Sequence, residues 1–361
     1  MMKIRAIKAR AVAAPMKRPL ATSTGTVGEA ALLLIDLETD GGITGRSYLF
    51  GLGRHNLPPI AKLVEAMAAM VNGDEVAPLD LERKLRAKYT LLGVHNIVLF
   101  AMSGIDMAAW DALAQARGVP LARLLGAAPR PIPAYNSNGL GILPLKDLER
   151  EAVALVEEGF RAVKLRLGRP DAEQDLLALQ AVKRQIPQKT VLMVDFNQSL
   201  TVAEAIRRGR MIDDEGGVYW IEEPVRADDF AGCGRVAREV ATLIQIGENF
   251  MGPEQMAQAL AAGACDYAMP DAQRIGGVTG WMRAAALAQA AGMEMSSHLF
   301  PEVSAHLLAA TPTAHYLEYV DWADVLLEEP LVIENGHAVI AATPGNGMRW
   351  NADAVARYCI S

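Results

Sequence analysis

From residue 132 to about residue 320, short apolar segments alternate with stretches of helical spacing, and most of the apolar segments end in a charged or strongly polar residue. The eight segments that we expect to be strands are Ile132–Ser137, Ala162–Leu167, Val191–Asn197, Val218–Glu223, Ile244–Glu248, Tyr267–Asp271, Met293–His298 and Tyr316–Val320. Eight strands joined by helices predict a parallel sheet closed into a (β/α)8 barrel. The alternative is an open doubly wound sheet, which the absence of a glycine-rich turn after a first strand disfavours.

The residues before this region have a different pattern. Lys3–Ala14 and Ala31–Glu38 have strand character, and the polar segment Pro19–Glu29 between them has the composition of a loop. Helical spacing follows from about residue 58 and is clearest in Ser103–Ala116, which Ser103 can cap. Three prolines in Ala127–Pro133 indicate a boundary. We therefore predict an α+β domain over residues 1–130, a barrel over 131–320 and a terminal segment over 321–361.

Composition excludes some classes of function. Hydrophobic residues make up 51% of the 361 positions, enough for a large core in about two domains. A formal charge of −7 argues against a nucleic-acid partner, which would need a basic surface. No run of 18 apolar residues is present, so we expect no membrane span. Three scattered cysteines and a poor signal sequence lead us to expect a cytoplasmic location.

Three carboxylates stand at the ends of three successive predicted strands: Asp195, Glu222 and Glu248. In a barrel, the carboxyl ends of the strands meet at one mouth, where the active site of this fold lies. Three oxygen ligands without cysteine or histidine suit magnesium, or manganese, rather than zinc. The alternative is that one of these acids only pairs with Arg166 or Arg274.

Other strand ends carry groups that suit proton transfer. Lys164 and Arg166 are two residues apart and share one face of a strand, so we expect the arginine to lower the pKa of the lysine. Asp271 and His298 end neighbouring strands, where the aspartate can fix the histidine tautomer. Glu318, if protonated, can donate a hydrogen bond to a developing oxyanion.

With these residues in place, the chain resembles the mandelate racemase group of the enolase superfamily along nearly its whole length. The resemblance is carried by the strings TGTVGEAALLLIDLETDGGITGRSYLF, GIDMAAWDALA, GFRAVKLRLG, VDFNQSL, WIEEP, GENF, MPDAQRIGGVTGW and SSHLFPEVSAHLLAATPTAH. It implies a capping domain, completed by the C-terminal tail, over a TIM-like barrel. It also implies a small carboxylate substrate, and association into a homo-oligomer is expected.

The resemblance assigns a role to each matched residue. The three strand-end carboxylates hold magnesium, and Lys164 offsets the charge of the substrate carboxylate. Asp271 and His298 form the dyad that is the base for one face of the α-carbon. Glu318 bonds the enolised carboxylate, Asn197 contacts the α-hydroxyl, and Ser137 contacts the carboxylate.

The chain departs from the family pattern at Arg166, where mandelate racemase has a second lysine that acts as the base for the other face. An arginine stays charged in proteins and is a poor base. The capping segment also differs, because Lys17, Arg18 and the run Thr22–Thr24 suggest a polar cavity, and Gly51-Leu52 after Phe50 offers no aromatic wall.

Three functions remain open. The first is dehydration of an acid sugar to a 2-keto acid, in which one base takes the α-proton and a metal-stabilised enediolate expels a β-hydroxyl. The second is racemisation or epimerisation of a 2-hydroxy acid. The third is a non-catalytic relative, which the retained carboxylates and the retained dyad argue against.

Overall fold

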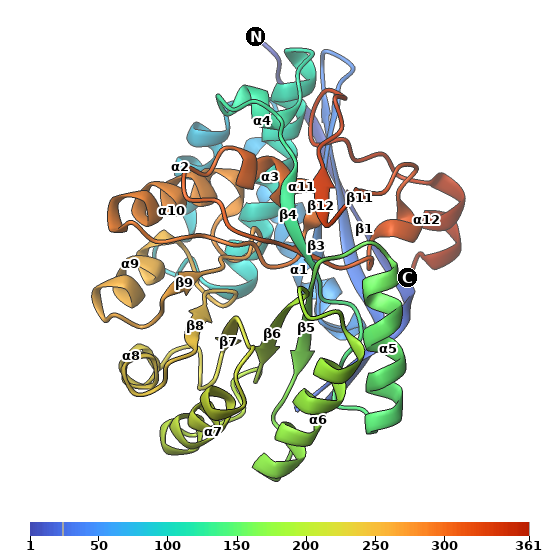
Figure 1. Ribbon diagram of the computed structural model, residues 1–361. Helices are drawn as coiled ribbons and strands as arrows, with labels where there is room; N and C mark the ends of the chain where they lie inside the picture. Colours follow the sequence, from blue (N-terminus) through green and yellow to red (C-terminus); the bar gives the residue numbers. More distant parts are fainter. Residues whose placement is uncertain (24, 361) are drawn as a thin grey trace.

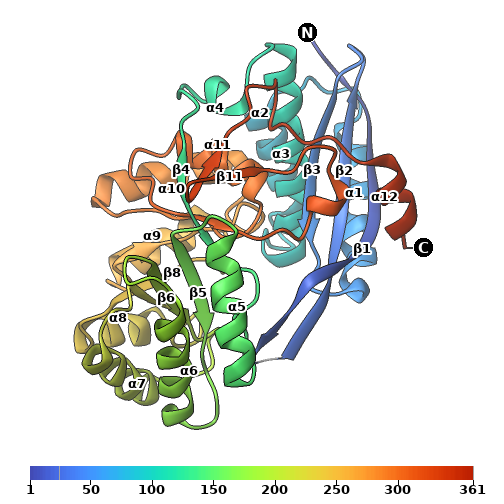
Figure 2. The same ribbon diagram turned by 45° about the vertical axis from the view of Figure 1, so that its right-hand side comes forward.

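The computed structural model describes residues 1–23 and 25–360. It consists of a closed parallel barrel beside a three-stranded antiparallel sheet backed by helices (Figures 1 and 2). Thr24, part of the predicted polar run Thr22–Thr24, lies outside the described residues.

The barrel confirms the predicted fold class. Its regular strands are β4 (Ile132–Asn136), β5 (Ala162–Arg166), β6 (Val191–Asp195), β7 (Trp220–Glu222), β8 (Leu243–Ile246), β9 (Tyr267–Ala268) and β10 (Leu317–Tyr319). Each of β4 to β8 pairs in parallel with the next strand in the chain, and β10 pairs in parallel with β4. The predicted strand Met293–His298 is present only as bridges, in which Met295 pairs with Ala268 and with Ala314, and His298 pairs with Asp271. These bridges close the ring.

Helices cover the outside of the barrel (Figure 1). They are α5 (Leu145–Glu157), α6 (Ala172–Gln185), α7 (Val202–Glu215), α8 (Phe230–Glu239), α9 (Pro253–Ala261), α10 (Gly277–Ala291) and α11 (Pro301–Ala309). The side chains of Thr201 and Asp229 cap α7 and α8 by accepting backbone N–H groups. The last strand, β10, is followed by a short 3₁₀ helix, η2 (Asp324–Leu326), so the eighth unit departs from the expected strand-plus-helix pattern.

The three-stranded sheet belongs to the cap and consists of β1 (Ile4–Thr22), β2 (Gly25–Thr39) and β3 (Thr44–Phe50). It is followed by η1 (Arg54–Asn56), α1 (Leu57–Val71), α2 (Pro78–Tyr89), α3 (Asn96–Ala116) and α4 (Leu121–Leu124). The predicted loop Pro19–Glu29 is wrong, because β1 and β2 continue through most of it as a long hairpin that reaches down beside the barrel (Figure 2). At its end, the amide of Ile142 donates to the carbonyl of Ala21.

Helix α3 packs closely on the sheet. A Cβ at Gly45 in β3 would collide with the backbone of Ala108 and Ala112, so this contact requires glycine. The predicted start at Ser103 is wrong: α3 begins at Asn96, and the hydroxyl of Ser103 bonds to the carbonyl of Leu99 inside the helix. By length and composition alone α3 can cross a membrane, but 78% of its apolar window is buried inside the protein.

The C-terminal segment contacts both parts of the molecule. Its short strands β11 (Val332–Glu334) and β12 (His337–Val339) form a hairpin, and β12 pairs with β4 of the barrel. Its final helix, α12 (Ala352–Tyr358), lies beside β1 of the cap (Figure 1). The predicted boundaries at residues 130 and 320 stay predictions.

His306 is a buried histidine of α11, and we expect it to make the stability of the protein sensitive to acid. The Nδ1 atom of His306 accepts the amide of Ala122, and burial lowers the pKa of His306 to about 4. In the unfolded chain this histidine has its ordinary pKa of about 6.5, so it takes up a proton at a higher pH than in the folded protein. The free energy of unfolding is therefore highest above pH 6.5 and decreases as the pH falls toward 4. At pH 5 this loss is about 2 kcal/mol.

We expect the fall in unfolding free energy between pH 7.5 and pH 5 to be smaller in His306→Gln by about this amount. Urea unfolding at the two pH values measures it, and His55→Gln, at an exposed position, is the control. Identical pH dependence in His306→Gln and the unmodified chain would show that His306 is not the responsible group.

Candidate active site and metal centre

The barrel strands bring the predicted acidic residues to one level. In the parallel register, Arg166 pairs with Asp195, and Asp195 pairs with Glu222 on the next strand. Glu248 follows the end of β8 by two residues, after Gly247, which has a φ of 139°. Neighbouring strands therefore present these side chains at the same end of the barrel.

Asp195, Glu222 and Glu248 form a candidate metal centre. One carboxylate oxygen from each lies within 4.8 Å of those from the other two. The indole N–H of Trp220 donates to Glu222 Oε2 at 3.3 Å, which helps to hold that carboxylate in place. Three convergent carboxylates are a hard-oxygen set that fits Mg²⁺. The alternative reading required one of these acids to form an ion pair with Arg166 or Arg274. In the described residues, none of the three forms such a pair.

The ammonium of Lys164 lies among carboxylates. Its Nζ is 2.6 Å from Glu222 Oε1, 2.9 Å from Glu318 Oε1 and 3.2 Å from Asp195 Oδ2, and the side chain is 1% exposed. Burial lowers the pKa of Lys164, but the charges of Glu222 and Glu318 outweigh burial and raise the pKa well above its usual value. The expectation that Arg166 lowers this pKa is therefore wrong.

The guanidinium of Arg166 is held by oxygens of the loop after β4. Its Nη1 donates to the carbonyls of Ser137 at 3.1 Å and Gly139 at 3.0 Å, and its Nη2 donates to the hydroxyl of Ser137 at 3.0 Å. Arg166 lines the cavity at the barrel mouth, whereas Ser137 is fully buried and lies outside that lining. The structure thus places Ser137 as a support for Arg166.

His298 and Asp271 form the expected pair. His298 Nδ1 is 2.7 Å from Asp271 Oδ2, so the aspartate favours a proton on Nδ1 and leaves Nε2 as the free ring nitrogen. That Nε2 lies 3.4 Å from Glu248 and 3.8 Å from Glu318. Burial lowers the pKa of His298, but the charges of Glu248, Glu318 and Asp271 raise it to about 9.

Glu318 is an ionised acceptor in this arrangement. Its Oε2 accepts the amide of Leu299 at 3.0 Å, and its Oε1 pairs with Lys164. Burial raises the pKa of Glu318, but the charges of Lys164 and His298 outweigh burial and hold the pKa below its usual range. The structure therefore does not favour the protonated donor that we expected.

Asn197 braces one carboxylate of the metal centre. Its backbone amide and its Nδ2 donate to the two oxygens of Asp195, at 2.7 and 2.9 Å. This contact needs the left-handed turn after β6, where Asn197 has a φ of 44°. Asn197 lines the cavity, and its Oδ1 atom is buried without a partner in the described chain.

Glu223, Asn249 and Arg274 are polar residues of the cavity that were not predicted as site residues. Glu223 Oε1 accepts from Asn249 Nδ2 at 2.6 Å, and Arg274 donates to the amide oxygen of Asn249. Burial and the charge of Glu248 raise the pKa of Glu223 well above its usual value. These residues lie in the strings WIEEP, GENF and MPDAQRIGG, but nothing in the spacing distinguishes them from structural polar residues.

The cavity has a volume of about 300 Å³, a polar floor from the barrel and a largely apolar wall. Its apolar lining is Leu20, Val27, Phe50, Leu52, Leu299 and Trp322. The rings of Phe50 and Trp322 lie 5.2 Å apart. Lys17 and Arg18 are outside this cavity, paired with Asp321 and Glu158. The expectation of a polar cap is therefore wrong for Lys17 and Arg18, whereas Thr22 does line the cavity. Gly51-Leu52 supplies no ring, as expected, but Phe50 and Trp322 form an aromatic wall that we did not predict.

Comparison with known proteins agrees with this geometry. Residues 147–354 match the family described as enolase C-terminal domain-like, and residues 5–126 match the N-terminal domain of the mandelate racemase/muconate lactonizing enzyme family. L-talarate/galactarate dehydratase of Salmonella typhimurium is 30% identical over 331 residues, which cover 90% of this chain and 82% of that protein.

Two solved structures are closer in sequence. An enolase from the alpha proteobacterium BAL199, with bound magnesium, is 43% identical and superposes with a TM-score of 0.97 over all of both chains. A Bradyrhizobium enolase complexed with magnesium and mandelic acid is 44% identical, with a TM-score of 0.95 over 100% of this chain and 99% of that one. Other relatives are named as cycloisomerases and epimerases.

Proposed function

Because this chain belongs to the mandelate racemase/muconate lactonizing enzyme family of the enolase superfamily, we propose that it dehydrates a 2,3-dihydroxycarboxylate to a 2-keto acid. It is a magnesium-dependent enzyme, and Asp195, Glu222 and Glu248 would hold the ion. Bound magnesium neutralises charge on the substrate carboxylate and so makes the neighbouring α-proton more acidic.

One observation carries this proposal: among the cationic side chains on the described lining of the cavity, His298, whose pKa is raised to about 9, is the one that loses its proton most readily, and it acts as the base in its deprotonated form. Arg166 is fixed by Ser137 and Gly139, and Lys164 is held as an ammonium among carboxylates. Inversion at the α-carbon normally needs a base on each face. Elimination needs only one, so the geometry favours dehydration.

The proposed reaction runs through His298 in both steps. Nε2 takes the α-proton, and the electron pair of the C–H bond passes toward the carboxylate. The C–O bond at the β-carbon then breaks, and the imidazolium returns its proton to the departing hydroxyl, which leaves as water. The resulting enol tautomerises to the 2-keto acid. Lys164 lies where it can offset carboxylate charge during these steps.

The cavity wall limits the rest of the substrate. A carboxylate bound near Lys164 and Arg166 directs the far end of the substrate toward Phe50, Leu52 and Trp322. A second carboxylate placed against this apolar wall would lose water, and the further arginine on the described lining, Arg274, is already bonded to Asn249. We therefore propose a monocarboxylate whose far end is short or apolar, rather than a dicarboxylic acid sugar.

A substrate panel tests the proposed function. With magnesium present, we expect keto acid from 2,3-dihydroxy monocarboxylates with an alkyl or phenyl group at carbon 3, and much less from aldarates of similar length. Absence of keto acid from all monocarboxylates and all acid sugars would rule out dehydration. If aldarates are turned over faster than the monocarboxylates, the enzyme is still a dehydratase, but the apolar wall does not select monocarboxylates as we propose.

Racemisation of a 2-hydroxy acid is the second candidate. It is favoured by the Phe50–Trp322 wall, which suits an aromatic ring, and by the Bradyrhizobium enolase, whose structure contains mandelic acid. Incubating each mandelate enantiomer in heavy water separates the possibilities. Exchange in only one enantiomer indicates a single base, and inversion of both would establish racemisation.

Replacing Arg166 by lysine should supply the missing base. A lysine can lose its proton, whereas arginine does not, so we expect α-proton exchange in the enantiomer that the unmodified enzyme leaves untouched, at least about tenfold above background. Deuterium incorporation measured by NMR checks this. Arg166→Met removes the charge without adding a base and should show no such gain. Equal gains in both variants would mean that the lysine does not act as a base.

A further inference from the structure

The strand that carries Phe50, one half of the aromatic wall, lies at the edge of its sheet. β3 pairs on one side with β2, and Phe50 stands opposite Leu32 at the end of that pairing. The outward N–H and C=O groups of an edge strand need partners from elsewhere when they are buried. Phe50 is 6% exposed, so its backbone depends on partners within the protein.

Gln273 of the barrel supplies both partners. Its Oε1 accepts the amide of Phe50 at 2.7 Å, and its Nε2 donates to the carbonyl of Phe50 at 3.3 Å. The side-chain amide therefore makes the two bonds that a neighbouring strand would make, and it is itself buried. Two bonds to one residue fix the orientation of the Phe50 backbone as well as its distance from the barrel.

Gln273 lies on the turn that also carries the aspartate of the dyad. The carbonyl of Asp271 accepts the amides of Arg274 at 3.1 Å and Ile275 at 2.8 Å, and the carboxylate of Asp271 accepts the amide of Arg274 at 3.0 Å. Asp271 also holds His298. One hydrogen-bonded turn thus positions both the base and the cap residue that faces it across the cavity.

We propose that Gln273 is a positioning residue for substrate specificity, which holds the ring of Phe50 at a fixed place relative to His298 so that the apolar end of a carboxylate ligand packs against it. This inference rests on the proposed function, in which that end of the substrate meets the wall. Phe50 and Trp322 line the cavity, whereas Gln273 is outside the described lining, so Gln273 acts through Phe50. A displacement of about 1 Å at such a contact is enough to change binding and rate.

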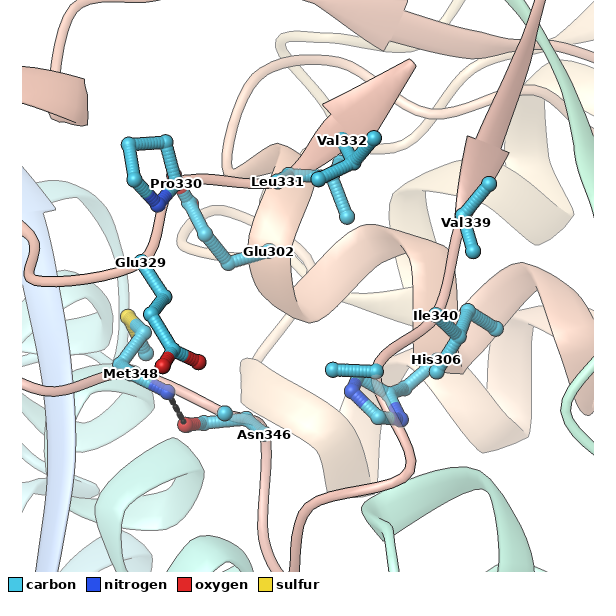
Figure 3. A pocket seen from close by; sticks show the side chains of 12 residues that line it. Glu302, His306, Glu329, Pro330, Leu331, Val332, Val339, Ile340, Asn346 and Met348 are labelled. Carbon is cyan, nitrogen blue, oxygen red and sulfur yellow. Dashed lines mark hydrogen bonds between the residues drawn. The ribbon is translucent and has the colours of Figure 1, made fainter. Parts of the chain in front are cut away.

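A second anchor of β3, away from the wall, provides a matched control. Asn346 of the C-terminal segment donates through its Nδ2 to the carbonyl of Arg46 at 2.9 Å, and its Oδ1 accepts the amide of Met348 (Figure 3). Asn346 lines a different cavity, between α11 and the C-terminal segment, which shares no described lining residue with the cavity at the barrel mouth. Removing this anchor loosens the same strand without touching Phe50.

The test compares two ligands on the magnesium-loaded enzyme. Racemic mandelate and racemic lactate share a carboxylate and an α-hydroxyl, but mandelate has a phenyl group where lactate has a methyl group. By calorimetry we expect the unmodified enzyme to bind mandelate at least about tenfold more tightly. Gln273→Met, which keeps a similar volume and removes both bonds, should lower this preference to about threefold or less while the affinities for lactate and magnesium stay within a few fold. Asn346→Ala should retain the preference.

A double-mutant cycle shows whether Gln273 acts through Phe50. Phe50→Leu removes the ring, keeps the backbone bonds to Gln273 and does not depend on the folding of Gln273→Met. We expect it to lower the preference for mandelate, and we expect Gln273→Met to cause no further loss in this background. Equal affinities for the two ligands in the unmodified enzyme, an unchanged preference in Gln273→Met or Phe50→Leu, an equal loss in Asn346→Ala, or additive losses in the double variant would each overturn the proposal.

These affinities are measured at equilibrium and need no turnover. Absence of keto acid from the substrate panel would therefore reject dehydration and leave the role of Gln273 to be decided by binding. Loss of the expected preference would reject the role of Gln273 and leave the reaction to be decided by the panel.

Discussion

Replacing Asp195 by asparagine is expected to abolish magnesium binding at micromolar to low millimolar concentrations and to lower turnover on the order of a thousandfold. The substitution removes one of three negative charges that lie within 4.8 Å of one another. It also removes the carboxylate that accepts hydrogen bonds from both the backbone amide and the Nδ2 of Asn197. The asparagine side chain that replaces it at position 195 is therefore held less well in place. Magnesium titration by calorimetry and steady-state rates with and without EDTA measure the two effects.

Glu223→Gln is the matched control for this experiment. Glu223 is the neighbour of Glu222 in sequence and lines the same cavity, but it lies outside the three-carboxylate cluster and bonds to Asn249. We expect this variant to retain its affinity for magnesium within a few fold. Tight magnesium binding by Asp195→Asn, or its loss in Glu223→Gln alone, would mean that the metal centre has been assigned to the wrong carboxylates.

The metal centre was predictable because the barrel repeats one arrangement. Each strand-plus-helix unit places the end of its strand at the same mouth, so a polar residue at that position can be assigned to the site from spacing alone. Asp195 and Glu222 occupy paired positions of neighbouring strands, as this reasoning requires. The dyad of Asp271 and His298 followed in the same way, although its seventh strand is reduced to bridges.

The cap and the charge states were not predictable because they depend on distances between residues far apart in sequence. The polar composition of Pro19–Glu29 indicates a loop, yet pairing with β2 extends β1 through most of it, and Leu20 and Val27 turn toward the cavity. Lys17 points instead to Asp321. The pKa of Lys164 is raised because Glu222 and Glu318 approach its Nζ closely, whereas the neighbour in sequence, Arg166, turns away to Ser137.

Replacing His298 by asparagine should lower the rate of α-proton removal by about a hundredfold to ten-thousandfold, since a positioned general base contributes about that much. The side chain supplies the free ring nitrogen that faces the cavity, while its other nitrogen is held by Asp271. Magnesium binding should be retained, because His298 is not one of the three clustered ligands. We therefore expect the loss to fall on kcat, with a smaller change in KM, and deuterium exchange from heavy water to disappear together with turnover.

His315→Gln separates this effect from the general loss of a buried imidazole. His315 bonds to Tyr219 and Ser296 and lies outside the cavity lining, so its replacement should lower stability while the purified folded enzyme keeps its exchange rate. Exchange at the unmodified rate in His298→Asn would transfer the role of base to another group. Lys164 would then be the first candidate, and its ammonium would have to lose a proton despite the carboxylates that surround it.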